Sequence, residues 1–596
     1  MKRAGAGWWL AVTALCLLGG ALFSAGGWLP FERIKALADG LSPDGNFKIL
    51  TPFAMNELRL PLRLGGSLLV LAAAGLLVFR RKNQPFLSKI GPALRSLPAE
   101  VHELVGIFRP RSGEWPYLLA LLLVTVGAVL ARLLFTSDPM VHDETYTYIA
   151  FAARPWWDLL SDYHLPNNHI LHTVLVKLST SMFGMQPWAV RLPALVTGVL
   201  CIPAVYWLGK RLYSRPTGLL AAGLLAALPT WIDYNTNARG YSQMALLSVL
   251  LFGLAIYLRE HKNRAGWLMF AGLGALGFFT LPVFLYPFGM TLVWLAVSVL
   301  AEDAPAYGGH WKLLAYAGAF AILTVLLTGL CYLPVIMGSG LDALIANPYV
   351  QRLDVGSFWG RLGDRLGGAW YEWNKDLPLW LEITLALGFA AGLALHRKVS
   401  RVRIPAQLTS LVWLVLVLLI QRPDPNARLW TFLIPFWLVW SAAGLVEGLR
   451  LLCVTARWRS GLLVLALVGL TIFSYQRTLR YFPSLAPGPG NVEATALYLQ
   501  PLLEPADGVI ITSDDGPALW YYLRLYGTDD RYYVQQLDER TLERVYILVD
   551  ESVGQTLQSA AEDRRLEGVT FDFAGAQRLT RIGSTSIYLC DVGYNR

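Results

Sequence analysis

The sequence predicts an α-helical polytopic membrane protein with about 13 transmembrane helices and a small C-terminal α/β soluble domain. Hydrophobic residues make up 55% of the 596 residues and charged residues only 15%, whereas a soluble domain carries about 25% charge. Many apolar stretches also approach the roughly 20 residues that a helix needs to cross a bilayer. These observations argue against a soluble enzyme, a disordered scaffold and a disulfide-rich secreted domain.

The apolar stretches define the transmembrane part of the chain. They lie at residues 7–29, 64–79, 116–135, 188–208, 216–232, 242–258, 265–280, 282–300, 312–336, 379–395, 405–420, 429–446 and 460–475. The first is predicted to be a retained anchor with a cytoplasmic N-terminus, because it is long and lacks a clean cleavage site. Pro282 and Pro287 leave open one kinked or re-entrant element at 265–300, although the basic loops favour two spans.

Clusters of Lys and Arg set the predicted orientation. They fall at residues 80–82, 209–211, 259–264, 396–403 and 450–459, in loops that the alternation of spans places on the cytoplasmic side. The net charge of +9 therefore reflects topology, and no nucleic-acid partner is predicted. Membrane lipids are the expected surroundings. A bacterial plasma (inner) membrane is the expected location, since the chain is compact and lacks eukaryotic retention signals.

Four regions follow from this layout. Residues 1–82 hold two extra N-terminal helices, 83–115 a cytoplasmic linker, 116–478 the transmembrane core with outer loops at 136–187 and 337–378, and 479–596 an extracytoplasmic α/β domain. Strand-like runs at Val509–Thr512, Val545–Val549 and Thr585–Leu589 predict that domain, with helical patterns at Asn491–Leu503 and Glu551–Ala561. Loops as long as 136–187 are uncommon in a helical bundle unless they are functional.

Several other kinds of site are not indicated. The five cysteines have no paired spacing, so neither a disulfide framework nor a zinc ribbon is predicted. The sequence has no phosphate-binding loop, dinucleotide fingerprint or nucleophile elbow in its proper context. Direct use of ATP or a nicotinamide is therefore not predicted.

The first outer loop carries an acidic pair, Asp143 and Glu144, just past the end of a span. A carboxylate there could remove a proton from an acceptor hydroxyl during sugar transfer. The alternative is structural, with Asp143 or Thr145 capping the helix that follows.

Four of the eight histidines lie between residues 142 and 172. His169 and His172 share a helix face, and with Asp143 or His142 they could bind a divalent metal. Interfacial or hydrogen-bonding histidines are the favoured interpretation. A divalent metal remains an alternative, and no cofactor is required.

Three arginines lie at predicted outer ends of spans, namely Arg191, Arg239 and Arg428. Arginines there are informative because basic residues favour the opposite side. Their forked donors suit the oxygens of a lipid-linked phosphate. Snorkelling to headgroups, or pairing with Asp233 and Asp424, is the alternative.

The ordered motifs His142-Asp143-Glu144, Asn168-His169, Ala189-Val190-Arg191-Leu192-Pro193 and Ala238-Arg239-Gly240-Tyr241 resemble glycosyltransferase family 39. These are membrane enzymes of the GT-C fold, similar to protein mannosyltransferases and aminoarabinose transferases. The resemblance is densest over about residues 116–260. Relatives often carry His-Pro-Pro or Lys-Pro where this chain has Asn167-Asn168-His169, and the two helices before residue 83 look like additions to the family core.

The resemblance implies transfer of a sugar from a polyprenyl-phosphate carrier to a glycan, lipid or protein acceptor at the outer face, with inversion. By resemblance, Asp143 is the catalytic base and Glu144 supports it. Arg239 lies near the donor phosphate, with Arg191 and Arg428 as further contacts. Substrate contacts are expected from four residues: His169, Asn168, Tyr241 and Tyr146.

Two other classes of protein stay open. A transporter or flippase of lipid-linked sugars would need polar residues deep in several spans, and most spans here have none. A non-catalytic binding protein of the same fold is the second alternative, because sequence patterns alone do not separate binding from turnover.

Overall fold

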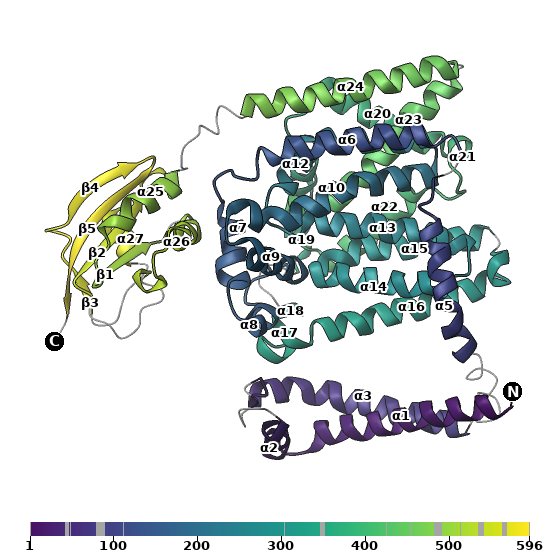
Figure 1. The fold of residues 1–596 in the computed structure, drawn as a ribbon, viewed down its shortest axis with the longest axis horizontal. Helices are drawn as coiled ribbons and strands as arrows, with labels where there is room; N and C mark the ends of the chain where they lie inside the picture. The colour runs from purple at the N-terminus through teal and green to yellow at the C-terminus, as the bar shows by residue number, and fades with distance from the viewer. Residues whose placement is uncertain are drawn as a thin grey trace.

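The computed structural model describes most of the chain (Figure 1). The described residues are 2–41, 47, 49–78, 90–110, 112–302, 304–345, 352–424, 426–452, 454–481, 491–512, 514–533, 542–562 and 569–594. The basic cluster at 80–82 and the predicted boundary between the N-terminal helices and the linker lie outside them.

A bundle of long helices forms the centre of the molecule (Figure 1). Its members are α6 (Trp115–Leu133), α10 (Pro187–Leu212), α11 (Arg215–Ala227), α13 (Tyr241–Glu260), α14 (Arg264–Thr280), α15 (Leu285–Ala301), α16 (His310–Cys331), α20 (Leu379–Ala394), α22 (Ala406–Gln421), α23 (Ile434–Leu451) and α24 (Ala456–Tyr481). Helix α13 is the innermost, because 94% of its apolar 18-residue stretch is buried inside the protein. For the corresponding stretch of α24 the share is only 6%. Protein therefore surrounds α13 on all sides, while α24 offers most of its surface to the bilayer.

Each of the 13 predicted spans falls on helical structure, although 216–232 is divided between α11 and α12 (Pro229–Asn235) and 312–336 runs from α16 into α17 (Leu333–Gly338). Among the described residues, eight helices are long and apolar enough to cross a membrane, or nine if one bent pair counts as a single span. That pair is α19 (Val355–Asn374) and α20, which meet at 111°. Of the other predicted spans, the first lies in α1 (Lys2–Trp28), 216–232 is the divided one, and 265–280 and 405–420 are helices of 17 and 16 residues. The prediction of about 13 crossings therefore exceeds the number that helix length and composition support. The elements at 265–280 and 282–300 are two helices, joined by a 3-10 turn at Pro282–Phe284.

The N-terminal helices form a hairpin beside the bundle (Figure 1). It consists of α1 (Lys2–Trp28), α2 (Phe31–Leu41) and α3 (Pro52–Val78). Helices α1 and α3 approach closely because glycines line their contact; a Cβ at Gly66 would lie 2.6 Å from Ser24 Oγ. The linker contains α5 (Ile90–Gly106), which packs against α14.

Short elements gather at one end of the bundle, next to the C-terminal domain (Figure 1). They are α7 (His142–Tyr146), the π-helix η1 (Thr147–Ala152), α8 (Trp156–Ser161), α9 (Ile170–Phe183), α12 (Pro229–Asn235), α17 (Leu333–Gly338), α18 (Asp342–Ile345) and the 3-10 helix η5 (Ala427–Leu433). We call this the α7 end. The loop at 136–187 supplies four of these elements, namely α7, η1, α8 and α9.

The C-terminal domain contains a five-stranded sheet, which confirms the predicted strand-containing fold. The strands are β1 (Asp507–Ile511), β2 (Arg544–Asp550), β3 (Val569–Phe571), β4 (Gln577–Ile582) and β5 (Thr585–Tyr594), with helices α25 (Asn491–Leu499), α26 (Gly516–Leu525) and α27 (Leu557–Glu562). The strand order is β1-β2-β5-β3, with β4 beside β5; only β1 and β2 are parallel. The helix predicted at Glu551–Ala561 is broken, because Gly554 takes a left-handed φ of 73°.

Helix α26 seats this domain on the α7 end. The Met140 backbone N–H donates a hydrogen bond to the Tyr522 hydroxyl at 2.8 Å. The Tyr521 hydroxyl donates to the Met185 carbonyl, and His142 Nδ1 lies 2.5 Å from the Asp514 carbonyl oxygen. The domain is thus packed directly against the loop that carries the acidic pair.

Close packing of α20 on α23 yields a test of the bundle. A Cβ at Gly444 would overlap the Gly388 carbonyl oxygen, whereas one at Gly448, a turn later in α23, meets nothing within 4 Å. We expect Gly444→Ala to lower the free energy of unfolding by about 1–3 kcal/mol through overpacking. Gly448→Ala should leave it unchanged or raise it by up to about 1 kcal/mol. Thermal unfolding in detergent measures both, and equal effects would contradict this packing.

Candidate active site

The acidic pair lies in the short helix α7. Val141 precedes the helix in an extended conformation, and its N–H donates to the Glu144 carboxylate at 3.2 Å. The Thr145 hydroxyl donates to the Val141 and His142 carbonyls. Glu144 and Thr145 therefore fix the start of α7. The Asp143 side chain accepts from Arg428 instead, so it does not serve as the N-cap of this helix.

Glu144 forms a buried ion pair with Arg191. Its carboxylate accepts from Arg191 Nε at 2.8 Å and from Nη2 at 2.6 Å, and the two side chains are only 1% and 3% exposed. The same carboxylate accepts the Ala238 backbone N–H at 2.8 Å. Glu144 thereby ties α7 to α10 and to the segment that carries Arg239. This arrangement suits a supporting role, in which Glu144 positions Asp143.

The remaining hydrogen-bond donors of Arg191 bond backbone carbonyls. Nη1 donates to the carbonyls of Phe135, Thr136 and Asp138, and Nη2 donates to that of Pro139. A buried guanidinium engaged in this way offers no free fork to a phosphate. Its geometry suits holding the 135–139 turn in place, and the phosphate contact predicted for Arg191 gains no support from it.

Asp143 faces two guanidinium groups. Arg428 Nη1 donates directly to its carboxylate, whose side chain is 30% exposed. Burial raises the pKa of Asp143, but the positive charges of Arg239 and Arg428 outweigh burial and bring the pKa below its ordinary value. Asp143 is therefore ionised at neutral pH. It combines ionisation with access to solvent, as a general base requires.

Arg239 is buried without a carboxylate of its own. Only 6% of the residue is exposed, and Nη1 donates to the Asn167 side-chain oxygen. Nη2 lies 3.3 Å from His169 Nε2, while the buried Nε has no hydrogen-bond partner. Within the described ranges, no carboxylate lies within ion-pair distance of this guanidinium. A buried cation without a counter-charge is unfavourable, so this position favours the binding of an anion.

His169 is held by the same segment. Its Nδ1 accepts the Gly240 N–H at 2.9 Å, so in the neutral ring the proton sits on Nε2, facing Arg239. Burial, followed by the charge of Arg239, lowers the pKa of His169 well below its ordinary value. Nε2–H and Arg239 Nη2 are then neighbouring donors without a shared acceptor. An anionic oxygen between them would satisfy both.

The other predicted substrate residues are placed differently. Tyr241 is buried, with its ring 5.1 Å from that of His169, and so belongs to the site. Asn168 is also buried, but its side chain holds the loop by donating to the Leu159 and Asp162 carbonyls. Tyr146 lies in α7, and its hydroxyl is 2.8 Å from His164 Nε2. The roles of Asn168 and Tyr146 in substrate binding thus stay predictions.

Sequence reasoning missed three neighbours of the site. Asn167 supplies an oxygen to Arg239, and Tyr234 donates to the Glu372 carboxylate of α19 at 2.7 Å. Burial raises the pKa of Asp138 to about 6, a change that Arg191 opposes and Glu144 reinforces. Asn167 lies in the departure from the family's motif that the sequence shows, but its contact with Arg239 was not predicted. Tyr234 and its partner in α19 lie 138 positions apart in the sequence, so no local sequence pattern predicts their contact.

The same arrangement of residues bears on the alternative that the histidines bind a divalent metal. No group of three or more His, Cys, Asp or Glu side chains suited to a metal ion occurs in the part of the chain that the structure describes. His169 and His172 are buried, with Arg239 as their charged neighbour.

Together these features define a class of protein: a bundle of membrane helices that presents a carboxylate and two arginines at one end. The fold is the GT-C fold. Solved structures of ArnT from Cupriavidus metallidurans match it in the apo state and bound to undecaprenyl phosphate, each with a TM-score of 0.52. They are 12% and 13% identical, and the matches cover 78% and 80% of this chain and 97% and 98% of theirs. At that identity the likeness shows the fold.

Sequence comparisons point to the same family. Residues 167–327 match the family model described as dolichyl-phosphate-mannose-protein mannosyltransferase. An undecaprenyl phosphate-alpha-4-amino-4-deoxy-L-arabinose arabinosyl transferase of Pseudomonas aeruginosa is 25% identical over 307 aligned residues, and the match covers 45% of this chain. The match spans 54%, about half, of that relative's length. The resemblance to family 39 expected from the motifs is confirmed.

The buried ion pair predicts a large effect of charge removal. Glu144→Gln leaves the Arg191 guanidinium buried without its counter-charge, and we expect a loss of about 3–5 kcal/mol in unfolding free energy. Asp158→Asn is the control, because its ion pair with Arg154 in the same loop is 37–45% exposed and should contribute less than about 1 kcal/mol. Thermal or denaturant unfolding in detergent separates them, and similar losses would refute the structural role.

Acid should destabilise the fold through His172. Burial, then the charge of Arg239, lowers the pKa of His172 to about 3, whereas the unfolded chain binds the proton near pH 6.5. Stability is therefore complete above about pH 6.5 and falls as the pH drops, by about 2 kcal/mol at pH 5 for this one group. His172→Gln should flatten the dependence of the melting temperature on pH between 8 and 5. His310→Gln, at the start of α16, should not, and identical slopes in all three proteins would contradict the argument.

Proposed function

We propose that this protein is a membrane glycosyltransferase that moves a sugar from a polyprenyl-phosphate carrier to an acceptor, with inversion and with Asp143 as general base. The shared fold, the family match and the arabinosyl transferase relative support this class of reaction. ArnT bound to undecaprenyl phosphate shows that a protein of this fold holds such a carrier.

One observation carries the proposal: the α7 end holds two guanidinium groups around a single carboxylate. Arg428 pairs with Asp143, while Arg239 is buried without a carboxylate partner among the residues described. The group Asp143, Arg239 and Arg428 has a formal charge of +1. The donor's phosphodiester carries one negative charge, so its binding makes this group neutral.

The same count holds at the end of the reaction. The acceptor oxygen forms a bond to the anomeric carbon, and its proton passes to Asp143. The bond from the anomeric carbon to the phosphate oxygen breaks, and its electron pair leaves with the carrier as a second phosphate charge. Protonation of Asp143 removes one negative charge as the phosphate gains one, so the site stays neutral throughout. In surroundings poor in water, avoiding a net charge change is a large electrostatic advantage.

His169 and Tyr241 complete the donor side. The Nε2–H of His169 and Nη2 of Arg239 converge toward the place where a phosphate oxygen would accept from both. Tyr241 packs its ring against His169 and lies under the Arg239 guanidinium, 5.7 Å from ring centre to Cζ. These contacts fix the orientation of the two donors before the lipid arrives.

The membrane placement is part of the proposal. Basic residues gather in loops opposite the α7 end, which favours an extracytoplasmic site, a cytoplasmic N-terminus and an extracytoplasmic C-terminal domain in a bacterial inner membrane. The carrier reaches the site from the bilayer, and a glycan, lipid or protein acceptor reaches it from the water side. No step here requires a metal.

Asp143→Asn tests the proposal. The amide keeps the shape of the side chain but cannot take the acceptor proton, so we expect sugar transfer to fall by about 10²–10⁴-fold. Mass spectrometry of envelope glycolipids and glycans, in cells with the wild-type or variant protein, measures the product. Binding of polyprenyl phosphate by the purified variant should persist. Transfer at the wild-type rate by Asp143→Asn would remove Asp143 as the base.

Arg239→Gln is the matched variant for the donor side. It should weaken binding of polyprenyl phosphate, because the buried positive charge is lost. Asp158→Asn, an acid in the same loop but outside the site, should leave transfer and binding unchanged. Unaltered lipid binding by Arg239→Gln would show that the phosphate lies elsewhere.

A further inference from the structure

A long groove lies between α24 and the rest of the bundle. Helix α24 lies on the outside, where it packs on α11 and α6, whereas α20 packs on α23 (Figure 1). Helices α20 and α24 therefore form the two walls of the groove, and α11 and α23 form its floor. Its volume is about 790 Å³, well within the roughly 300–1,000 Å³ typical of ligand sites. The proposed transfer reaction does not use it.

The groove has the length and the lining that hydrocarbon chains require. Along α24 it extends from Ala456 to Phe473, 17 positions or roughly 26 Å of helix, close to the ~30 Å of a bilayer's hydrocarbon core. Its side chains are almost all apolar. Two of them, Trp380 and Leu465, are 66% and 67% exposed, so the groove opens sideways towards the lipid.

Arg459 provides a positive charge at one end of the groove. Among the described residues that line the groove, it is the one that carries a charge. Its Nε is buried and has no hydrogen-bond partner in the described part of the chain. The acid of the preceding helix, Glu447, is paired with Arg450 at 3.1 Å. A buried guanidinium donor without an acceptor is unfavourable, so this end of the groove favours an anionic group.

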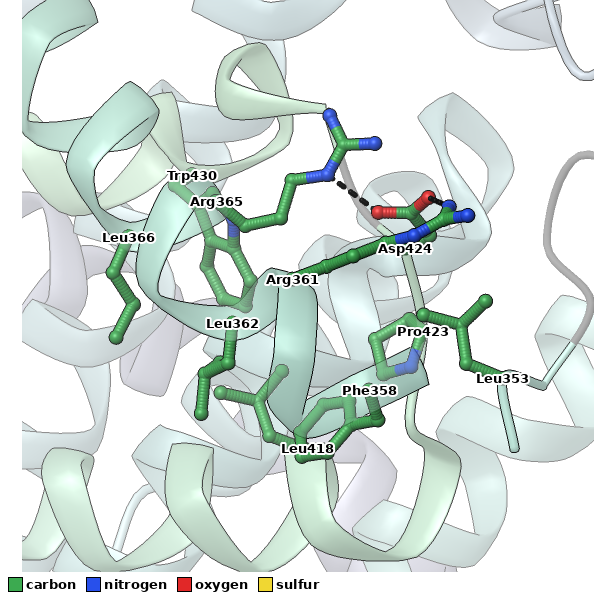
Figure 2. A pocket seen from close by; sticks show the side chains of 10 residues that line it. All are labelled: Leu353, Phe358, Arg361, Leu362, Arg365, Leu366, Leu418, Pro423, Asp424 and Trp430. Atoms are coloured by element: carbon green, nitrogen blue, oxygen red, sulfur yellow. Dashed lines mark hydrogen bonds and ion pairs between the residues drawn. The ribbon is translucent and has the colours of Figure 1, made fainter. Parts of the chain in front are cut away.

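The arginines of α19 lack this combination of an open donor and a large space. Arg361 Nη1 and Arg365 Nε donate to the two oxygens of Asp424 at 2.7 and 2.5 Å, as the dashed lines in Figure 2 show. The space beside them is about 20 Å³, which is room for a single water molecule. Arg459 differs in both respects, because its Nε is unsatisfied and the groove beside it is large.

The Arg459 end of the groove is the end opposite the catalytic residues. Arg477, near the other end of α24, pairs with Asp376 at 2.8 Å and lies 3.9 Å from Asp233 of α12, which belongs to the α7 end. Arg459 precedes Arg477 by 18 positions, or roughly 27 Å along the helix. A phosphate held by Arg459 is therefore too far from Asp143 to take part in sugar transfer.

The surroundings of Arg459 are also basic. Residues 447–459 contain three arginines and one glutamate, a net charge of +2. The first N–H groups of α24 lie at the same end, and the positive end of the helix dipole favours a phosphate there. Clusters of Lys and Arg at the cytoplasmic ends of membrane helices attract anionic lipid headgroups. The charge at this end of the groove thus matches an anionic lipid of that leaflet.

We propose that the groove between α20 and α24 binds an anionic glycerophospholipid from the leaflet opposite the active site. The lipid phosphate accepts from Arg459 Nε and from the first N–H groups of α24. The acyl chains lie along the apolar walls, beside Leu449, Leu463 and Leu385. This site goes beyond the proposed function and does not depend on it. The bound lipid fills the space beside α24 and so stabilises the packing of that helix on the bundle.

The choice of headgroup tests the role of Arg459. Native mass spectrometry of the delipidated full-length protein in detergent, with phosphatidylglycerol or phosphatidylcholine of equal acyl chains as the probe, measures binding of each lipid. Wild type should bind phosphatidylglycerol more tightly. Arg459→Gln should weaken that binding about ten- to a hundredfold, because hydrogen bonds between charged groups are lost, and should leave phosphatidylcholine unchanged.

Arg403→Gln is the matched control for charge. Arg403 is exposed in the loop before α22, at the same end of the bundle, and does not line the groove. Its replacement removes one positive charge and should leave binding of both lipids unchanged. Equal affinity of wild type for the two lipids, or equal effects of Arg459→Gln and Arg403→Gln, would overturn the proposal.

Two glycines of α24 provide an independent test of the groove. Gly469 lines it, whereas Gly461 on the same helix does not, and a Cβ at either position meets nothing within 4 Å. Gly469→Leu therefore fills part of the groove without straining the backbone, and it should weaken binding of phosphatidylglycerol. Gly461→Leu should bind it as wild type does. If the two leucine variants bind it equally well, the acyl chains do not lie in the groove and the proposal fails.

Thermal unfolding and competition complete the test. Phosphatidylglycerol should raise the melting temperature of wild type and Gly461→Leu more than that of Gly469→Leu, because a ligand of the folded state stabilises it. An equal rise in all three proteins would contradict the site. Excess undecaprenyl phosphate should not displace phosphatidylglycerol. Displacement would show that the groove holds the isoprenoid carrier and would overturn the assignment to a phospholipid.

Discussion

The buried ion pair between Glu144 and Arg191 is the interaction on which the site depends. One carboxylate binds α10, the Val141 N–H at the start of α7, and the N–H of Ala238 beside Arg239. Such a pair contributes little net stability compared with apolar packing. Its contribution is that it enforces a single geometry. Asp143 and Arg239 come from segments almost 100 residues apart, and Glu144 keeps them in register.

The helices were largely predictable because the bilayer imposes a simple rule on composition and length. Each predicted span falls on helical structure, yet 216–232 is interrupted at Leu228–Pro229, and 405–420 is a helix of 16 residues. Hydropathy locates apolar segments, but it does not reveal where a helix bends or how much protein covers it. The break in Glu551–Ala561 was missed for a related reason: Gly554 takes a conformation that periodicity does not report.

The site was predictable only as far as residue type and position carry chemistry. Asp143, Arg239, Arg428, His169 and Tyr241 meet as the motifs suggested. Arg191 also belongs to one of these motifs, but its donors point inward to Glu144 and to the carbonyls of residues 135–139. A sequence motif does not specify the direction in which a side chain points. The contact of Tyr234 with Glu372 was not foreseen, because the two residues lie 138 positions apart in the sequence. Asp424, a possible partner of an outer arginine, pairs instead with Arg361 and Arg365 of α19.

The seating of α26 on α7 also has a consequence for biosynthesis. The bond between Met140 and Tyr522 joins positions 382 residues apart, so the ribosome finishes the helix of the acidic pair long before its partner exists. Until residues 514–522 emerge and fold, the His142 and Met140 contacts have nothing to meet. The contacts that hold the α7 end are therefore completed only after the C-terminal domain has been synthesised, and a truncated chain would lack them.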